Sequence, residues 1–224
     1  MAYHRLRVPT RLGCKFSLIC VGTAALVSAL SAPSVSDTMF IEPVIQVEED
    51  WQLVLNEPDD GLTTPQFHTA MSPFGHTDSL FAQVTWNYRE IPDFSAGGLQ
   101  MQGWHEDGVL TDRSFAYGAL SRVAETVGWT QTLTADGTMG SFSITNGYSN
   151  TWSTFGYPAQ NMKLHGVVNV SNLDGYNPDV SVENSGVTFG SNRVRSLRIT
   201  EVRYYGASGL LAVDETPRVV FQLE

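Results

Sequence analysis

Residues 125–155, ETVGWTQTLTADGTMGSFSITNGYSNTWSTF, carry the pattern that decides the fold. Asp136-Gly137 separates two runs, Val127–Leu133 and Thr138–Thr145, in which apolar and polar residues alternate. Alternation with period two is typical of strands that bury one face, and Asp-Gly supplies the positive φ angles that a two-residue hairpin turn needs. The segment therefore predicts a β-hairpin, which needs further strands to bury its apolar face.

The alternation also predicts which side chains share a face. One strand places Val127, Trp129, Gln131 and Leu133 together, and the other pairs Phe142 with Ile144 and leaves Ser141, Ser143 and Thr145 opposite.

Similar short runs recur along the chain and predict further strands. They are Trp51–Leu55, Gln66–Ser72, Asp78–Tyr88, Gly97–Trp104, Met162–Val170, Val187–Phe189, Val194–Tyr205 and Arg218–Leu223. A break in the alternation predicts a β-bulge near Arg198, and Phe115–Val123 fits either a strand or a helical turn. Because no helical period is sustained, the sequence predicts an all-β, two-sheet antiparallel sandwich of roughly ten to thirteen strands.

The first 36 residues differ from the rest and have the layout of a secretory signal peptide. Basic residues precede the apolar run Phe16–Leu30, and small residues follow it. The run is shorter than the ~20 residues that span a membrane comfortably, so cleavage, after Ser31 or Ser36, is favoured over an uncleaved anchor. We expect a secreted, periplasmic or cell-surface protein, with no stable membrane insertion after cleavage.

The remaining chain divides into an acidic N-terminal segment, 37–50, and one sandwich domain, 51–224. Both cysteines, Cys14 and Cys20, lie in the leader, so the mature chain would have no disulfide and no thiol nucleophile. Loss of Arg5, Arg7, Arg11 and Lys15 moves the net charge from -10 to about -14. An acidic domain of this kind is not expected to bind nucleic acid or an anionic membrane.

Four segments together resemble the concanavalin A-like lectin/glucanase jelly roll, most closely its uncharacterised secreted bacterial members. They are GGLQMQGW at 97–104, ETVGWTQTL at 125–133, SFSITNG with TWSTFG at 141–156, and NSGVTFGSNRVRSLRITEVRYY at 184–205. The resemblance implies two curved sheets, a concave face that often binds glycans, and a calcium site in many members. It covers about Trp51 to Tyr205.

The sequence departs from the glucanase branch of that family. Those enzymes carry a Glu-x-Asp-x-x-Glu strand, in which carboxylates act as nucleophile and acid/base, and this chain has no such run. It also has no Gly-x-Ser-x-Gly nucleophile motif and no His-Glu-x-x-His zinc motif. His105-Glu106-Asp107 fits a solvated turn better than an acid/base pair, because consecutive strand residues point in different directions.

A polar face with one aromatic ring is the best candidate for ligand binding. Alternation places Gln83, Thr85, Asn87, Gln100, Gln102 and Trp104 on one side of two neighbouring strands. Amides bind sugar hydroxyls and an aromatic ring stacks on an apolar sugar face, whereas the alternative is an ordinary solvated sheet face. With Trp152 taken as exposed in a polar loop, the predicted glycan contacts are Asn87, Gln100, Gln102, Trp104 and Trp152.

Oxygen donors for calcium gather in one turn-rich segment. Asn172, Asp174, Asn177 and Asp179 could supply part of the ~6–8 oxygens that Ca²⁺ needs, and Asp59 with Asp60 forms a second pair. The alternative is that these are ordinary turn residues.

These features predict an exported, non-catalytic sandwich that binds a polysaccharide or glycan. The alternatives are a structural or interaction component of the cell envelope and, third, a glycan-active enzyme with atypical carboxylates.

Overall fold

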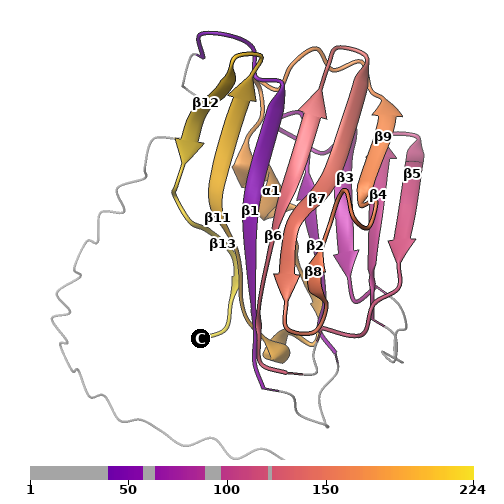
Figure 1. Ribbon diagram of the computed structural model, residues 1–224, viewed down its shortest axis with the longest axis vertical. Helices are drawn as coiled ribbons and strands as arrows, with labels where there is room; N and C mark the ends of the chain where they lie inside the picture. The colour runs from indigo at the N-terminus through magenta and orange to yellow at the C-terminus, as the bar shows by residue number, and fades with distance from the viewer. Residues whose placement is uncertain (1–39, 58–63, 89–96, 121–122) are drawn as a thin grey trace, which may run out of the picture. The chain divides into compact units, whose positions relative to one another are not determined.

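The computed structural model describes residues 40–57, 64–88, 97–120 and 123–224. The predicted signal peptide, both cysteines and the Asp59–Asp60 pair lie outside these residues. Two antiparallel sheets face each other, which confirms the predicted two-sheet sandwich (Figure 1).

Sheet A has eight strands and sheet B has five. The central path of sheet A runs β12 (Gly209–Asp214), β11 (Val194–Gly206), β1 (Gln46–Leu55), β6 (Thr126–Ala135), β7 (Met139–Ser149) and β8 (Ser153–Phe155). Two short strands complete it, since β13 (Arg218–Gln222) pairs with β11 and β9 (Lys163–Val167) pairs with β7. Sheet B runs β10 (Gly186–Phe189), β2 (Gln66–Met71), β3 (Leu80–Trp86), β4 (Leu99–His105) and β5 (Gly108–Phe115).

The predicted hairpin is confirmed as β6 and β7, with its turn one residue later than expected. The backbone N–H of Asp136 donates to Met139 O at 3.1 Å, so the two enclosed residues are Gly137 and Thr138. Gly137 has φ +95°, and glycine at the first central position is typical of a type II′ hairpin turn. The Asp136 carboxylate accepts from the Met139 N–H at 2.8 Å and closes the turn from outside.

The core between the sheets is unusually aromatic. Trp86 of sheet B lies 4.3 Å from Trp129 of sheet A, between ring centroids, and also contacts Phe67 and Trp152. The predicted inward face of β6 and the pair Phe142 and Ile144 are all buried here. A polar link crosses this core, since Gln131 of β6 donates to Thr69 of β2 at 2.5 Å.

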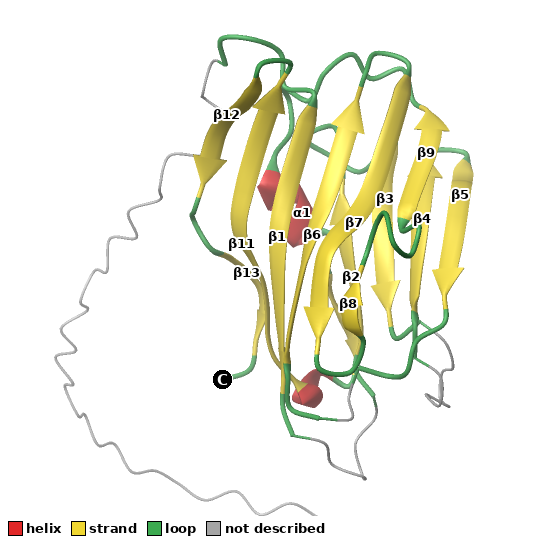
Figure 2. Ribbon diagram, in the orientation of Figure 1, coloured by secondary structure: helices red, strands yellow, loops and turns green. Residues whose placement is uncertain are grey.

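Several elements differ from the sequence prediction. The edge strands β5 and β12 and the short helix α1 (Pro178–Glu183) were not predicted, since the segment of β12 was expected to be a polar loop, and β1 begins at Gln46, within the predicted acidic segment (Figure 2). Helix α1 is capped by Asn177, whose side chain accepts from the Asp179 N–H, and a 3-10 turn, η2 (Ser191–Arg193), leads into β11. The bulge in β11 lies at Thr200, two residues beyond the predicted position, because Asp50 pairs with Glu201 and Trp51 with Ile199.

None of the helices among the described residues is both long enough and apolar enough to span a membrane.

Candidate functional site

The predicted polar and aromatic face forms on the outer side of sheet B. Gln83 pairs with Gln102 and Thr85 with Gln100, so the amides of β3 and β4 do lie side by side. Phe81 pairs with Trp104, and their rings stack with centroids 6.0 Å apart and planes 3° apart. Phe81 was missed although it has the same alternation as Gln83.

Two residues predicted on this face or beside it lie elsewhere. Asn87 is fully buried with φ +50°, donates to Pro65 O at 2.7 Å and accepts from the Leu120 N–H at 2.9 Å. It follows the end of β3 and fixes two loops instead of facing solvent. The exposure predicted for Trp152 is also wrong: the side chain is 6% exposed and its indole donates to Gly118 O at 2.6 Å.

A groove of about 260 Å³ crosses the outer face of sheet A at a level where two β-bulges occur. In β11 the bulge leaves Thr200 without a partner in β1, and in β7 two residues, Asn146 and Gly147, lie opposite Trp129 alone. Bulges re-aim side chains and are enriched next to functional sites. The groove is lined by Asp50, Trp51, Gln52, Gly128, Trp129, Thr130, Asn146, Tyr148 and Thr200.

An exposed aromatic ring forms one wall of this groove. Tyr148 of β7 lies directly opposite Gly128 of β6, and a Cβ atom placed on Gly128 would come within 2.3 Å of the Tyr148 ring. The ring therefore occupies the space above the glycine, yet the residue remains 52% exposed. Glycine at 128 is what lets the ring lie against the sheet.

Polar groups beside the ring are held in fixed orientations. Both oxygens of Asp50 accept from Arg203, at 2.6 and 2.9 Å, and one also accepts from the Thr130 hydroxyl at 2.6 Å. The Gln52 carbonyl accepts from Arg198 at 2.6 Å, which fixes the amide and leaves its NH₂ group as the free donor among the described residues. Asn146, with φ +54°, donates to Thr130 at 3.3 Å and keeps its own carbonyl as an acceptor.

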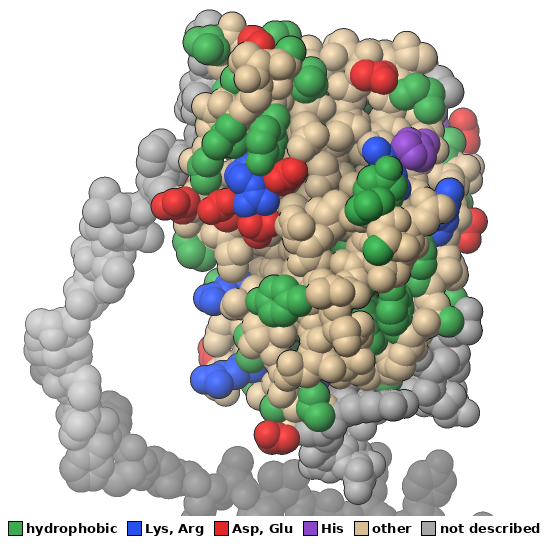
Figure 3. Space-filling model, viewed as in Figure 1, with side chains coloured by type: hydrophobic (Ala, Val, Ile, Leu, Met, Phe, Trp, Pro, Cys, Tyr) green, Lys and Arg blue, Asp and Glu red, His purple; other side chains and the backbone are tan. Residues whose placement is uncertain are grey.

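Charge on this face is concentrated at one side of the groove. Arg203 also bonds to Glu48 and Glu201, so three carboxylates surround one guanidinium, and the hydrogen bonds with Asp50 are the largest cause that raises the pKa of Arg203. Figure 3 shows these acidic and basic side chains gathered over β1 and β11, next to a neutral stretch over β6 and β7. The arrangement can hold a neutral polar ligand through hydrogen bonds and one aromatic contact.

A second carboxyl group of interest lies on the opposite, inner face of β1. Glu49 is fully buried, and it accepts from the Tyr176 hydroxyl at 2.6 Å and from the Trp51 indole at 3.0 Å. Burial raises the pKa of Glu49 to about 7, although hydrogen bonds from Tyr176, Ser181 and Trp51 act in the other direction. Because its side chain faces the interior between β1 and α1, it is separated from the groove by the sheet itself.

The four predicted calcium ligands lie in the loop before α1 and in its first turn, and each has a protein partner. Asp174 accepts from the Val44 N–H, Asn172 accepts from the Asp174 N–H, and Asn177 caps the helix. Asp179 forms an ion pair with Arg218 at 3.1 Å, which disfavours a divalent cation at that carboxylate. This donor set fits capping and pairing better than calcium.

His105, Glu106 and Asp107 form the one cluster of three or more His, Cys, Asp or Glu ligand atoms within the described part of the chain. It lies in the turn that joins β4 to β5, where His105 and Asp107 are 3.7 Å apart and Asp107 is almost fully exposed. This position agrees with the predicted solvated turn.

No protein-family model matches this sequence, and no curated protein sequence matches it. Among solved structures, the chain is similar to scytalido-glutamic peptidase bound to a transition state analog inhibitor, with 10% identity, a TM-score of 0.29, and coverage of 80% of this chain and 84% of that chain. A second structure, the same peptidase with a peptide based transition state analog, gives 11% identity, the same TM-score, and coverage of 81% and 84%. Likeness this weak carries no inference about activity.

Proposed function

We propose that this protein is exported and binds a short, neutral carbohydrate in the groove of sheet A, without catalysing a reaction on it. The observation that carries the proposal is Tyr148, a half-exposed ring set against Gly128 among oriented polar groups. Sugars are bound by stacking on such a ring and by hydrogen bonds from amides, hydroxyls and carboxylates. The groove volume of about 260 Å³ lies just below the ~300–1,000 Å³ of most small-molecule sites, which suits a short saccharide.

Three further features support this class of ligand. The amides of Gln52 and Asn146 are each held at one end, by Arg198 and by Thr130. The other end of each amide remains as a hydrogen-bonding group for a ligand. Both oxygens of the Asp50 carboxylate are held by Arg203, which suits an acceptor for hydroxyl groups better than a nucleophile. The sequence resemblance to the concanavalin A-like lectin/glucanase jelly roll favours the same ligand class and the bacterial, exported origin.

A glycan array with residues 37–224, followed by calorimetry on any hit, tests the proposal. We expect Tyr148→Ala to weaken binding by about five- to thirtyfold, and Tyr148→Phe to retain most of it, since loss of a stacked ring costs roughly 1–2 kcal/mol. Tyr157→Ala is the matched control, because Tyr157 is also an exposed tyrosine (41%) but does not line the groove.

The same experiment separates the groove from the polar face of sheet B. Trp104→Ala removes the ring beside Gln102 and should leave the affinity unchanged if the groove is the site. Loss of binding in Trp104→Ala, with Tyr148→Ala unaffected, would move the site to sheet B. A blank array would contradict carbohydrate binding and favour the structural component of the cell envelope.

A further inference from the structure

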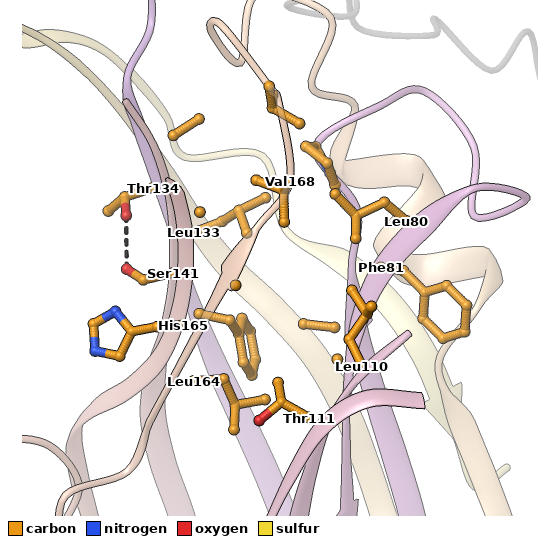
Figure 4. A pocket seen from close by; sticks show the side chains of 18 residues that line it. Leu80, Phe81, Leu110, Thr111, Leu133, Thr134, Ser141, Leu164, His165 and Val168 are labelled. Carbon is orange, nitrogen blue, oxygen red and sulfur yellow. Dashed lines mark hydrogen bonds between the residues drawn. The ribbon is translucent and has the colours of Figure 1, made fainter. Parts of the chain in front are cut away.

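A second cavity opens between the two sheets where the edge strands β5 and β9 approach each other, and it is almost entirely apolar. Leu80, Leu110, Leu133, Leu164 and Val168 surround it, as Figure 4 shows. The hydroxyls of Thr134 and Ser141 are hydrogen-bonded to each other at 2.7 Å and are not available to it. A water molecule in this cavity would lack the ~2–4 polar partners that it needs, so an apolar occupant is favoured.

Small residues create this cavity. Five of the positions that line it from both sheets are Ala82, Gly103, Ala135, Gly140 and Gly166. Both alanines are buried and belong to facing strands, β3 and β6, so their short side chains leave a gap where larger core residues would meet. Close packing is the norm in protein interiors, and a gap lined this way marks a place for a ligand.

The size of the cavity restricts the shape of the occupant. Its volume is about 60 Å³, against the ~10–15 Å³ that one water-sized group requires and the ~150 Å³ of a cavity that binds benzene. Roughly four methylene-sized groups in a row fit that volume, whereas an aromatic ring does not. This volume favours the end of a linear alkyl chain over an aromatic ring.

The border of the cavity indicates the charge of the rest of that molecule. Thr111 lines the cavity, and Arg113 follows two residues later on the same face of β5, about 6–7 Å along the strand. Arg113 is exposed and has no ion pair or hydrogen bond among the described residues. The strand also exposes two large apolar side chains, Val109 (45%) and Leu110 (51%), at the end where the cavity lies. The apolar side chains at one end of β5 suit an alkyl tail, and the guanidinium of Arg113 further along the strand suits an anionic head group.

We infer that the cavity between β5 and β9 binds a single-chain anionic amphiphile, a fatty-acid-like carboxylate, with its tail end among Leu80, Leu133 and Leu164 and its head at Arg113. This site is on the opposite side of sheet A from the carbohydrate groove and does not depend on it.

Calorimetry with sodium decanoate below its micelle concentration tests the inference, with decanol as the uncharged probe. We expect saturable binding of decanoate. Ala82→Leu adds three carbon atoms to the space for about four methylene groups and should weaken binding by about fiftyfold without lowering the midpoint of thermal unfolding. Ala135→Leu fills the same space from the other sheet and serves if Ala82→Leu does not fold.

The charge of the head is tested separately. Arg113→Gln should weaken decanoate binding by about two- to fivefold and leave decanol binding unchanged, as expected for an exposed ion pair. Arg195→Gln, an exposed arginine on β11, is the matched control and should change neither affinity. Non-saturable uptake, an absence of binding, or full decanoate affinity in both filled variants would overturn the inference.

Discussion

Glu49 shows how an ionisable side chain can be buried in a core without the full free-energy cost of burying a charge. Its carboxyl group is buried beside Tyr176, Tyr204 and Arg218, and hydrogen bonds from Tyr176 and Trp51 satisfy its oxygens. An unpaired buried carboxylate costs several kcal/mol, so the group avoids that cost by keeping its proton. Desolvation is the largest cause, and it places the pKa of Glu49 at about 7.

We predict that Glu49→Gln flattens part of the pH dependence of stability. The pKa of Glu49 in the folded protein, about 7, lies above the 4.5 of an ordinary glutamate, so the folded protein binds more protons between these values. The stabilisation is fully present below pH 4.5 and is lost as pH rises through 7. At about 1.4 kcal/mol per pH unit, the loss is roughly 3 kcal/mol.

Urea denaturation from pH 4.5 to 7.5 measures this effect. The free energy of unfolding of the wild type, minus that of Glu49→Gln, should fall by that amount across the range. Glu183→Gln, an exposed acid on α1, should follow the wild type at every pH. Parallel wild-type and Glu49→Gln curves would show that Glu49 is already ionised at pH 4.5.

At the scale of single elements, α1 is short but closes one part of the core. Its Val180 and Ser181 are buried, and Tyr176, just before the helix, reaches Glu49. A six-residue helix gains little from its own hydrogen bonds, because nucleation is costly. The Asn177 cap and Pro178 at the first turn therefore matter more here than in a long helix.

We predict that Asn177→Ala lowers the free energy of unfolding by about 1 kcal/mol, because it removes the acceptor of the Asp179 N–H. Asn177→Ser retains a capping oxygen and should lie within a few tenths of a kcal/mol of the wild type. Urea denaturation at pH 7 compares the three proteins. Equal losses for both substitutions would mean that Asn177 acts through a contact other than the cap.

The elements that could be predicted from the sequence are those with one clear period. The hairpin of β6 and β7 alternates cleanly because large apolar side chains lie on its inner face and small polar side chains such as Thr132 and Ser143 lie on the other, although both faces are largely covered. Strand β5 does not, since it is an edge strand with neither face well buried, and Asp112-Arg113 interrupts any pattern. Helix α1 is too short to show a helical period, and the Asn and Asp residues that form the turns before it are also the residue types that bind calcium.

The groove of sheet A could not have been found in the same way. Its residues come from β1, β6, β7 and β11, and strand order is not visible in the chain. Bulges at Thr200 and at Asn146 also shift the alternation that assigns side chains to a face. By contrast, the polar face of sheet B was predicted because β3 and β4 are consecutive in the chain and pair without a shift from Leu80 to Trp86.

At the scale of the sandwich, aromatic contacts tie the two sheets together. Trp129 of sheet A contacts Trp86 of sheet B, and the loop residue Trp152 lies on Trp86 with ring centroids 5.8 Å apart. Trp152 also stacks on Tyr117 with ring centroids 4.6 Å apart. Aromatic pairs of this kind contribute about 0.5–1.5 kcal/mol each beyond the area that they bury. Trp152 therefore belongs to the core, where it holds the loop residue Tyr117 and the strand residue Phe155 against Trp86.

We predict that Trp152→Ala lowers the free energy of unfolding by about 3–5 kcal/mol, because it leaves a large cavity and an unpaired Gly118 carbonyl. Trp152→Phe should cost less, since it keeps the contact with Trp86. Trp104→Ala, on the outer face of sheet B, should cost less than Trp152→Ala because Trp104 is only partly buried. Urea denaturation followed by far-UV circular dichroism compares the variants without relying on tryptophan emission. If Trp152→Ala keeps its stability but loses carbohydrate binding, Trp152 contacts the ligand. If it loses stability and the folded molecules bind with unchanged affinity, Trp152 acts in the core.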